Sequence, residues 1–214
     1  DLLDIARLYC KNTTIQSMYI TTNASLPDRV VNFAETIINF DKDIELTFQI
    51  SIDDMPKEHD RVRKISNLFE SCIDTYQRLK KINKRVTPIV SITVNHENCE
   101  NIEEIFKYLT EERKIDSIKC TVVRDEGVYH TPDQKKQNIF QAYSWLTNKI
   151  NYMQKKEKLN NYNASTIQGR LHNKKDAISW KLIKKMYLKP KYISPCHAGS
   201  LFGIVTASGL VYPC

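Results

Sequence analysis

The sequence predicts an α/β protein in which parallel strands alternate with helices. Short runs rich in β-branched residues alternate with longer segments whose apolar residues recur at helical spacing. This alternation is typical of repeated βα units around a parallel sheet. With 214 residues, 41% of them hydrophobic and 27% charged, the chain is large enough to bury a substantial core.

The expected elements follow one another in a regular order. The chain opens on residues 1–9 with helical spacing and no initiator Met, so we expect it to begin inside an element. Ser25 is expected to cap the helix that begins near Pro27. We expect strands at 15–22, 44–53, 86–94 and 118–123, and helices at about 27–40, 65–79, 101–109, 133–156 and 174–188.

Three segments are predicted along the chain. Residues 1–150 hold the βα core, 151–190 form a basic helical linker, and 191–214 begin a second domain. Because the chain stops at Cys214 without a polar tail or closing helix, we expect it to be an internal piece of a longer protein. No apolar run approaches the roughly 20 residues of a bilayer span and no signal peptide is visible, so we expect a cytoplasmic protein without a membrane partner.

The net charge of +7 is unevenly distributed. Between Lys149 and Lys191 the sequence has twelve Lys or Arg residues and two acidic residues, Glu157 and Asp176. Such a run is most often a solvated helical face, although it could also meet an anionic partner. Nucleic acid is not expected as a partner, because neither interleaved aromatic residues nor a recognisable nucleic-acid motif accompanies the run.

Polar side chains follow each of the four predicted strands. Because the carboxyl ends of parallel strands lie at one edge of a sheet, these side chains should form a polar ring there. Turn preferences alone can explain Asn23, Asp54 and Asn95 taken one at a time. Their coincidence over four strands favours a binding site. The ring is expected to contain Thr22, Asn23, Gln49, Ser51, Asp53, Asp54, Asn95, His96, Arg124, Asp125 and Glu126.

Three stretches resemble motifs of radical S-adenosylmethionine (radical SAM) enzymes. Residues 20–24, Ile-Thr-Thr-Asn-Ala, resemble the TNG strand end of this family, and 49–54, Gln-Ile-Ser-Ile-Asp-Asp, resemble its SLDG strand end. Residues 59–63, His-Asp-Arg-Val-Arg, followed by Phe-Glu at 69–70, resemble its HD-x-x-R and F positions. The resemblance covers most of residues 1–124 and implies a partial (β/α)6 radical SAM barrel. The alternation of elements permits this barrel but does not distinguish it from an open doubly wound sheet.

Two residues depart from these motifs. Ala24 and Asp54 each stand where the family has Gly, which readily adopts positive φ. Asp tolerates that region better than Ala, so the loop around Ala24 is the larger departure.

The resemblance implies a site for S-adenosylmethionine at the strand ends. Ser51 would hydrogen-bond the cofactor, and Arg63 would reach its carboxylate or ribose, where a guanidinium offers paired donors. Asn23 and Asp53 would line the same mouth, with Asn95 as a further candidate.

Two cysteines near the end of the chain form a further pattern. Twelve residues separate Cys196 from Gly209, and four separate Gly209 from Cys214. This spacing resembles the start of a SPASM or twitch domain, in which a β-hairpin brings cysteines onto an auxiliary 4Fe-4S cluster, with Gly209 in the turn. The alternatives are a structural zinc site, which would require close Cys pairs, and two free buried thiols.

His59 and His197 are expected to be polar surface or hydrogen-bonding residues and not metal ligands. Ordinary buried or half-buried thiols are expected at Cys10, Cys72, Cys99 and Cys120.

The resemblance implies that the complete protein is a radical SAM enzyme. A reduced 4Fe-4S cluster would cleave S-adenosylmethionine to a 5′-deoxyadenosyl radical, which abstracts hydrogen from a substrate in the barrel mouth. The three-cysteine loop that binds this cluster is expected upstream of Asp1, so the chain alone should not catalyse the reaction. The implied partners are a peptide or protein substrate, as in maturases, or a small molecule, and an electron donor such as a flavodoxin or ferredoxin. An acidic leader peptide or a phosphorylated substrate would suit the basic segment.

Two other readings of the sequence stay open. One is a non-catalytic binding protein derived from the barrel, and the other is a zinc-stabilised α/β enzyme of different chemistry. Metal analysis separates the second from the radical SAM interpretation. Iron with acid-labile sulfide would support a radical SAM enzyme, and stoichiometric zinc would support the zinc-stabilised enzyme.

Overall fold

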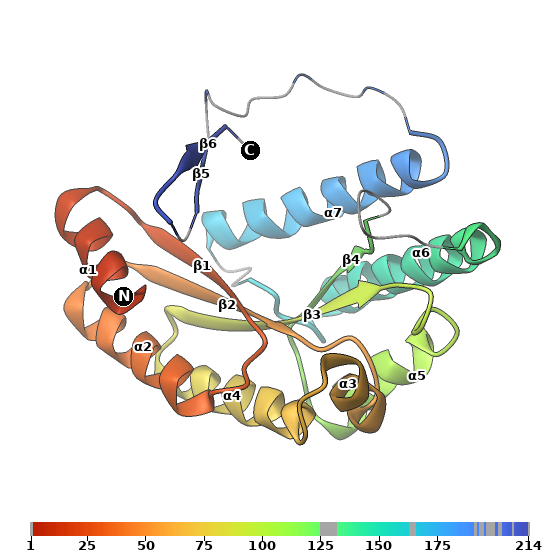
Figure 1. Ribbon diagram of the computed structural model, residues 1–214, viewed down its shortest axis with the longest axis horizontal. Coiled ribbons are helices and arrows are strands. Elements are labelled where there is room, and N and C mark those ends of the chain that lie inside the picture. The colour runs from red at the N-terminus through yellow and green to blue at the C-terminus, as the bar shows by residue number, and fades with distance from the viewer. Residues whose placement is uncertain are drawn as a thin grey trace.

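The computed structural model describes residues 2–124, 132–162, 166–190, 192, 195, 200, 203–206 and 208–213 (Figure 1). Asp125, Glu126, Cys196, His197 and Cys214 lie outside the described residues, so the expectations for them stay predictions.

The core of the described chain is a parallel sheet with helices, which confirms the predicted α/β class. Its strand order is β1-β2-β3-β4, with no reversal of the kind that marks a doubly wound sheet. The pairing places Thr22 beside Ile50 and Ser51 beside Ser91, so the strands end at one edge. Strand bounds are β1 (Ser17–Thr22), β2 (Glu45–Ser51), β3 (Val86–Val94) and β4 (Ile118–Val122).

The helices occupy the connections that the sequence predicted, with some differences. The expected loop after β2 contains the short helix α3, and Ile65 lies between α3 and α4. The helix near residue 101 ends in a π-helical turn, and the last long helix begins at Ile167, where the Thr166 side chain accepts a hydrogen bond from the Gly169 N–H. Helix bounds are α1 (Leu2–Asn12), α2 (Pro27–Phe40), α3 (Pro56–Arg63), α4 (Leu68–Ile82), α5 (Ile102–Lys107), the π-helix η1 (Tyr108–Glu112), α6 (Asp133–Lys155) and α7 (Ile167–Tyr187).

One face of the sheet is packed against α2 and α4. Alternate residues of β2, Leu46, Phe48 and Ile50, point to this face and are buried, as the two-residue period of a strand requires. Phe48 meets Phe33 of α2 edge to face, with ring centroids 6.2 Å apart. These side chains belong to one apolar core that also includes residues of α5 and α6.

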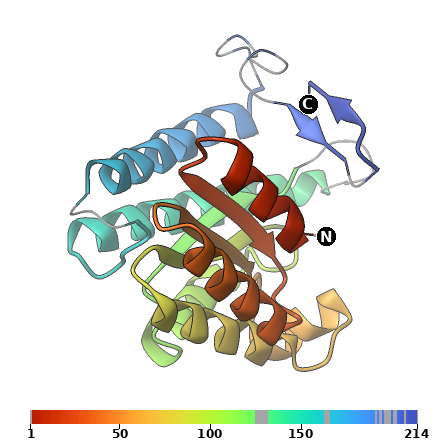
Figure 2. The same cartoon turned by 90° about the vertical axis from the view of Figure 1, so that its left-hand side faces the viewer.

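The opposite face of the sheet is polar. Lys119 of β4 donates a hydrogen bond to the Tyr19 hydroxyl of β1 at 3.1 Å, although β1 and β4 are the two edges of the sheet. Neighbouring strands lie about 4.8 Å apart, so these two long side chains extend towards each other across the middle strands. Helix α7 lies over this face (Figures 1 and 2). A parallel sheet whose strands follow one another in chain order suits part of a barrel, while a (β/α)6 barrel stays a prediction.

A small hairpin is present in the described part of the C-terminal segment. Strand β5 (Ile204–Val205) pairs antiparallel with β6 (Val211–Tyr212), and Gly209 has φ 81° in the turn. Gly209 therefore occupies the turn position that the sequence predicted. The auxiliary cluster and the three-segment division remain predictions.

Candidate functional site

Asp53, just after β2, is at the centre of a hydrogen-bond network at the carboxyl edge of the sheet. Its Oδ1 accepts from the Thr93 N–H at 2.8 Å, and its backbone carbonyl accepts from Asn98 Nδ2 at 2.7 Å. Its Oδ2 pairs with Arg63. Both carboxylate oxygens therefore have partners within the protein, and the Asp53 side chain is only 14% exposed.

Arg63 reaches this edge because α3 ends there. Pro56 suits the first turn of α3, and Lys64 ends the helix in the left-handed region at φ 55°. The Arg63 side chain is 35% exposed while it pairs with Asp53, so part of its guanidinium faces solvent. The structure thus brings together two residues that the sequence placed in one site.

Asn95 and Asn98 form the loop after β3. Asn95 Oδ1 accepts from the backbone N–H groups of Glu97 and Asn98, at 2.8 and 3.2 Å. Buried Asn98 donates from Nδ2 to the carbonyls of Asp53 and Thr93, and its Oδ1 accepts from the Asn95 N–H at 2.9 Å. Sequence reasoning missed Asn98; its signal was the Asn-x-x-Asn spacing directly after a strand.

The backbone carbonyls of Asn23 and Ser51 both lie close to the Cys72 thiol. The Cys72 thiol donates to the Asn23 carbonyl at 3.2 Å and lies 3.8 Å from the Ser51 carbonyl. Asn23 Oδ1 accepts from the N–H and hydroxyl of Ser25. Ser25 therefore belongs to this turn, and the prediction that it caps α2 is wrong: the N-cap is Leu26, without a side-chain hydrogen bond.

Ala24, which stands where the resembled motif has Gly, adopts a positive φ. It has φ 53° and is fully buried. Asp54, the other departure, does not have positive φ. Its side chain is largely buried, its Oδ1 accepts from the Met55 N–H at 2.7 Å, and burial raises its pKa above the usual range.

His59 is a buried hydrogen-bonding residue. Its Nδ1 accepts from the Asp53 N–H at 3.4 Å, and its ring meets Phe69 edge to face at 6.1 Å. Among the described residues, Nε2 has no hydrogen-bond partner. Burial lowers the His59 pKa below its usual value, and the positive charge of Arg63 acts in the same direction.

The side-chain groups that stay free at this edge are mainly hydrogen-bond donors. In the described part of the chain, the Ser51 hydroxyl has no partner, and Asn23 and Asn95 use Oδ1 within their turns. Their Nδ2 amides and the exposed part of the Arg63 guanidinium are left to donate. This edge therefore suits a ligand rich in acceptors, such as a carboxylate with a ribose or purine.

No protein-family model and no curated protein matches the chain. Among solved structures, it is similar to one described as hexahistidine-tagged anSMEcpe with bound AdoMet, at 14% identity and a TM-score of 0.50. This match covers 70% of the present chain and 40% of the other chain. A structure described as native anSMEcpe with bound AdoMet and Kp18Cys peptide matches at 9% identity and a TM-score of 0.44, over 69% and 51% of the two chains.

The fold of the described chain is similar to that of the first of these structures. The chain spans less than half the length of the first of these structures. At such identity the likeness shows the fold alone, and the site residues stand on their own geometry.

The remaining members of the predicted polar ring differ in their positions. Gln49 is inside β2 and accepts a hydrogen bond from the Tyr19 hydroxyl at 2.6 Å, so the prediction that it lies at the strand end is wrong. Thr22 ends β1 and accepts from the Ala24 N–H at 2.9 Å. His96 and Arg124 are exposed.

The described thiols are separate from one another and from any cluster of metal-binding side chains. Cys72, Cys99 and Cys120 are buried and Cys10 is half-buried, which confirms that expectation. Burial raises the pKa of Cys72 to about 12, which disfavours the thiolate that iron or zinc requires. Within the described residues, no group of three His, Cys, Asp or Glu side chains is arranged to hold a metal ion.

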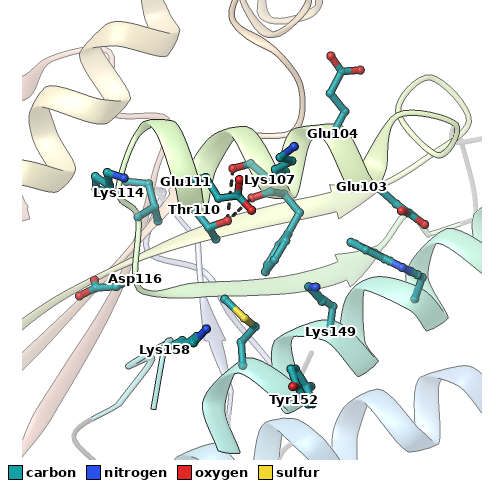
Figure 3. A pocket seen from close by; sticks show the side chains of 14 residues that line it. Glu103, Glu104, Lys107, Thr110, Glu111, Lys114, Asp116, Lys149, Tyr152 and Lys158 are labelled. Carbon is teal, nitrogen blue, oxygen red and sulfur yellow. Dashed lines mark hydrogen bonds between the residues drawn. The ribbon is translucent and has the colours of Figure 1, made fainter. Parts of the chain in front are cut away.

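A groove of about 930 Å³ lies between α5–η1 and α6, outside the sheet (Figure 3). Phe106 and Trp145 meet edge to face in it, with ring centroids 5.9 Å apart. The Thr110 hydroxyl donates to backbone carbonyls of its own helix and is not free for a ligand. Glutamates and lysines, including Lys107 and Lys149, share the rim, so the groove has no preference for one sign of charge.

Proposed function

We propose that the chain binds S-adenosylmethionine at the carboxyl edge of β1, β2 and β3, as part of a radical SAM enzyme. The observation that carries this proposal is the Asp53–Arg63 pair, fixed by backbone hydrogen bonds beside a hydroxyl and two amides that are free to donate. The radical SAM-like fold supports it, because one similar structure contains bound AdoMet.

Each residue then has a distinct role in binding. Arg63 donates to the carboxylate of the methionine part, and Ser51 donates to the same part of the cofactor. Asp53 positions Arg63, because its own oxygens are already used. Asn23 and Asn95 offer their amide groups to ribose or adenine acceptors.

The complete enzyme would act on a peptide or protein substrate, with an external electron donor such as a flavodoxin or ferredoxin. When bound and reduced by one electron, S-adenosylmethionine would supply hydrogen-abstraction chemistry. The described residues offer no ligand set for an iron–sulfur cluster, so we derive no step through one. An auxiliary 4Fe-4S cluster at Cys196 and Cys214 remains part of the proposal.

Equilibrium dialysis with labelled S-adenosylmethionine tests the site. Replacing Arg63→Ala should weaken binding about tenfold, because a charge-assisted pair is lost, and Ser51→Ala should weaken it less. Arg61→Ala is the matched control, since Arg61 is on the same helix and pairs with Glu58 at the surface. Equal weakening by Arg61→Ala and Arg63→Ala, or no measurable binding by the parent chain, would contradict the proposed site.

Iron and acid-labile sulfide measurements test the auxiliary cluster. After anaerobic reconstitution, Cys196→Ala combined with Cys214→Ala should lower bound iron and sulfide, whereas Cys10→Ala should leave both unchanged. Stoichiometric zinc in place of iron would favour the zinc-stabilised alternative.

A further inference from the structure

Helix α7 has one buried face that is fixed to the rest of the molecule. Trp180 is 3% exposed, and its indole N–H donates to the Cys120 carbonyl at 3.0 Å. Asp176, also on this face, is buried beside Lys119 of β4. These contacts set the rotation of α7 about its axis, so its opposite face points away from the sheet and α6.

The opposite face carries large apolar side chains in the open. Ile167, Leu171 and Ile178 are 71%, 64% and 60% exposed, values far above those of ordinary core-facing helix residues. They lie on one stripe with three exposed lysines, and Leu188 follows just beyond the helix. We call these six residues the α7 stripe: Ile167, Leu171, Lys174, Ile178, Lys181 and Lys185.

The α7 stripe is positively charged and has no acidic residue. Asp176 is the one acid in the sequence of α7, and it is 5% exposed on the buried face. Arg170, which is also exposed, adds to the positive charge beside the stripe. Three lysines of the basic segment that the sequence singled out, together with Arg170, therefore lie among exposed apolar side chains.

The spacing of the stripe indicates the shape of its partner. Its positions follow one another at intervals of four, three, four, three and four residues, which is the 3.5-residue period of a helix that packs along a second helix. A second copy of α7 would bring lysines against lysines, which is unfavourable. An acidic helix would instead place carboxylates opposite Lys174, Lys181 and Lys185.

We propose that the α7 stripe docks an acidic amphipathic helix of a partner protein. Apolar residues of that helix would pack on Ile167, Leu171 and Ile178, and its Glu or Asp side chains would pair with the lysines. This surface is separate from the strand ends, so the proposal stands whether or not the chain binds S-adenosylmethionine.

A designed peptide of about 21 residues, matched to the length of α7, serves as the probe. It carries Leu at a 3.5-residue period and Glu at the flanking positions. One control peptide has Lys in place of every Glu, and a second has the same composition with the Leu period broken. Fluorescence anisotropy with the whole chain should show binding of the acidic peptide, at least about tenfold weaker binding of both controls, and loss of affinity as salt rises.

Variants of the chain locate the binding surface. Ile178→Ser, and separately Lys174→Glu with Lys181→Glu, should each weaken binding about tenfold, with unchanged helical content by circular dichroism. Lys107→Glu with Lys149→Glu makes the same change of charge in the groove of Figure 3 and should leave affinity unchanged.

Four results would overturn the proposal. They are absence of peptide binding, equal affinity for the acidic and Lys peptides, equal loss in the groove variant, and a stable dimer of the chain that Ile178→Ser dissociates. Binding to vesicles with anionic lipids, together with no binding of the acidic peptide, would show a membrane-surface helix instead.

Discussion

Asp53 joins strand β3 to the loop after β2, because its Oδ1 accepts a hydrogen bond from the Thr93 N–H at 2.8 Å. Its other carboxylate oxygen pairs with Arg63, at the end of α3. One carboxylate therefore positions both the neighbouring strand end and a helix that follows in the chain. The loop therefore keeps a defined shape at the carboxyl edge of the sheet.

Replacing Asp53→Ala should lower the free energy of unfolding by about 1–3 kcal/mol, because a part-buried N–H and a guanidinium lose their acceptor. Urea denaturation measures the change. Asp74→Ala is the matched control: Asp74 pairs with Arg78 on the exposed face of α4, and such surface pairs contribute at most about 1 kcal/mol. An Asp53→Ala effect no larger than that of the control would mean that the network is not structurally important.

The sequence predicted features that depend on residues close together in the chain, and it missed features that depend on contacts between distant segments. The strand at 86–94 was predicted with the bounds that the structure has, and Arg63 was placed in one site with Asp53 by the resemblance to the family's HD-x-x-R motif. Asn98 was missed because an Asn after a strand suits any turn, and its two backbone partners become neighbours only when β2 and β3 pair. Gln49 was wrongly placed at the strand end, because a long polar side chain can lie on the polar face of a sheet as well as at the end of a strand.

Asp60 performs the capping that the N-cap residue of α4 does not. Its two oxygens accept from the backbone N–H groups of Asn67 and Phe69, at 2.6 and 2.8 Å, while Asn67 makes no side-chain cap bond. We expect Asp60→Ala to cost about 1–2 kcal/mol of stability, the usual effect of a lost N-cap. Chemical denaturation of Asp60→Ala checks this. Asn67→Gly is the control, because Asn67 has φ 60° and Gly removes its side chain without strain at that φ, so Asn67→Gly should not lower stability.

Lys64 and Ala24 both have positive φ, but their environments predict different responses to Gly. Lys64 is exposed at φ 55°, so Lys64→Gly should stabilise the protein by about 0.5–1 kcal/mol through relief of the left-handed conformation. Ala24 is fully buried, so Ala24→Gly gains similar relief and loses about 0.8 kcal/mol of methyl burial. Thermal unfolding should show a higher Tm for Lys64→Gly and little change for Ala24→Gly. A larger gain for Ala24→Gly would mean that burial of its methyl group contributes little.

His59 makes stability depend on pH. Its pKa in the folded protein is lowered, chiefly by burial, while in the unfolded chain it is about 6.5. The unfolded state therefore binds the proton more readily, so this contribution to stability is fully present above pH 6.5 and is lost as pH falls through the folded pKa. Urea midpoints at about pH 7, 6 and 5 should fall more steeply in the parent chain than in His59→Gln.

Exposed His96 provides the matched control for this measurement, because His96→Gln should leave the pH dependence of the parent chain unchanged. Gln at position 59 keeps an acceptor that can reach the Asp53 N–H, so the comparison isolates the proton that His59 would take up. Parallel curves for the parent chain and His59→Gln would show that His59 is protonated without cost, and that the buried environment of its ring opens before the protein unfolds.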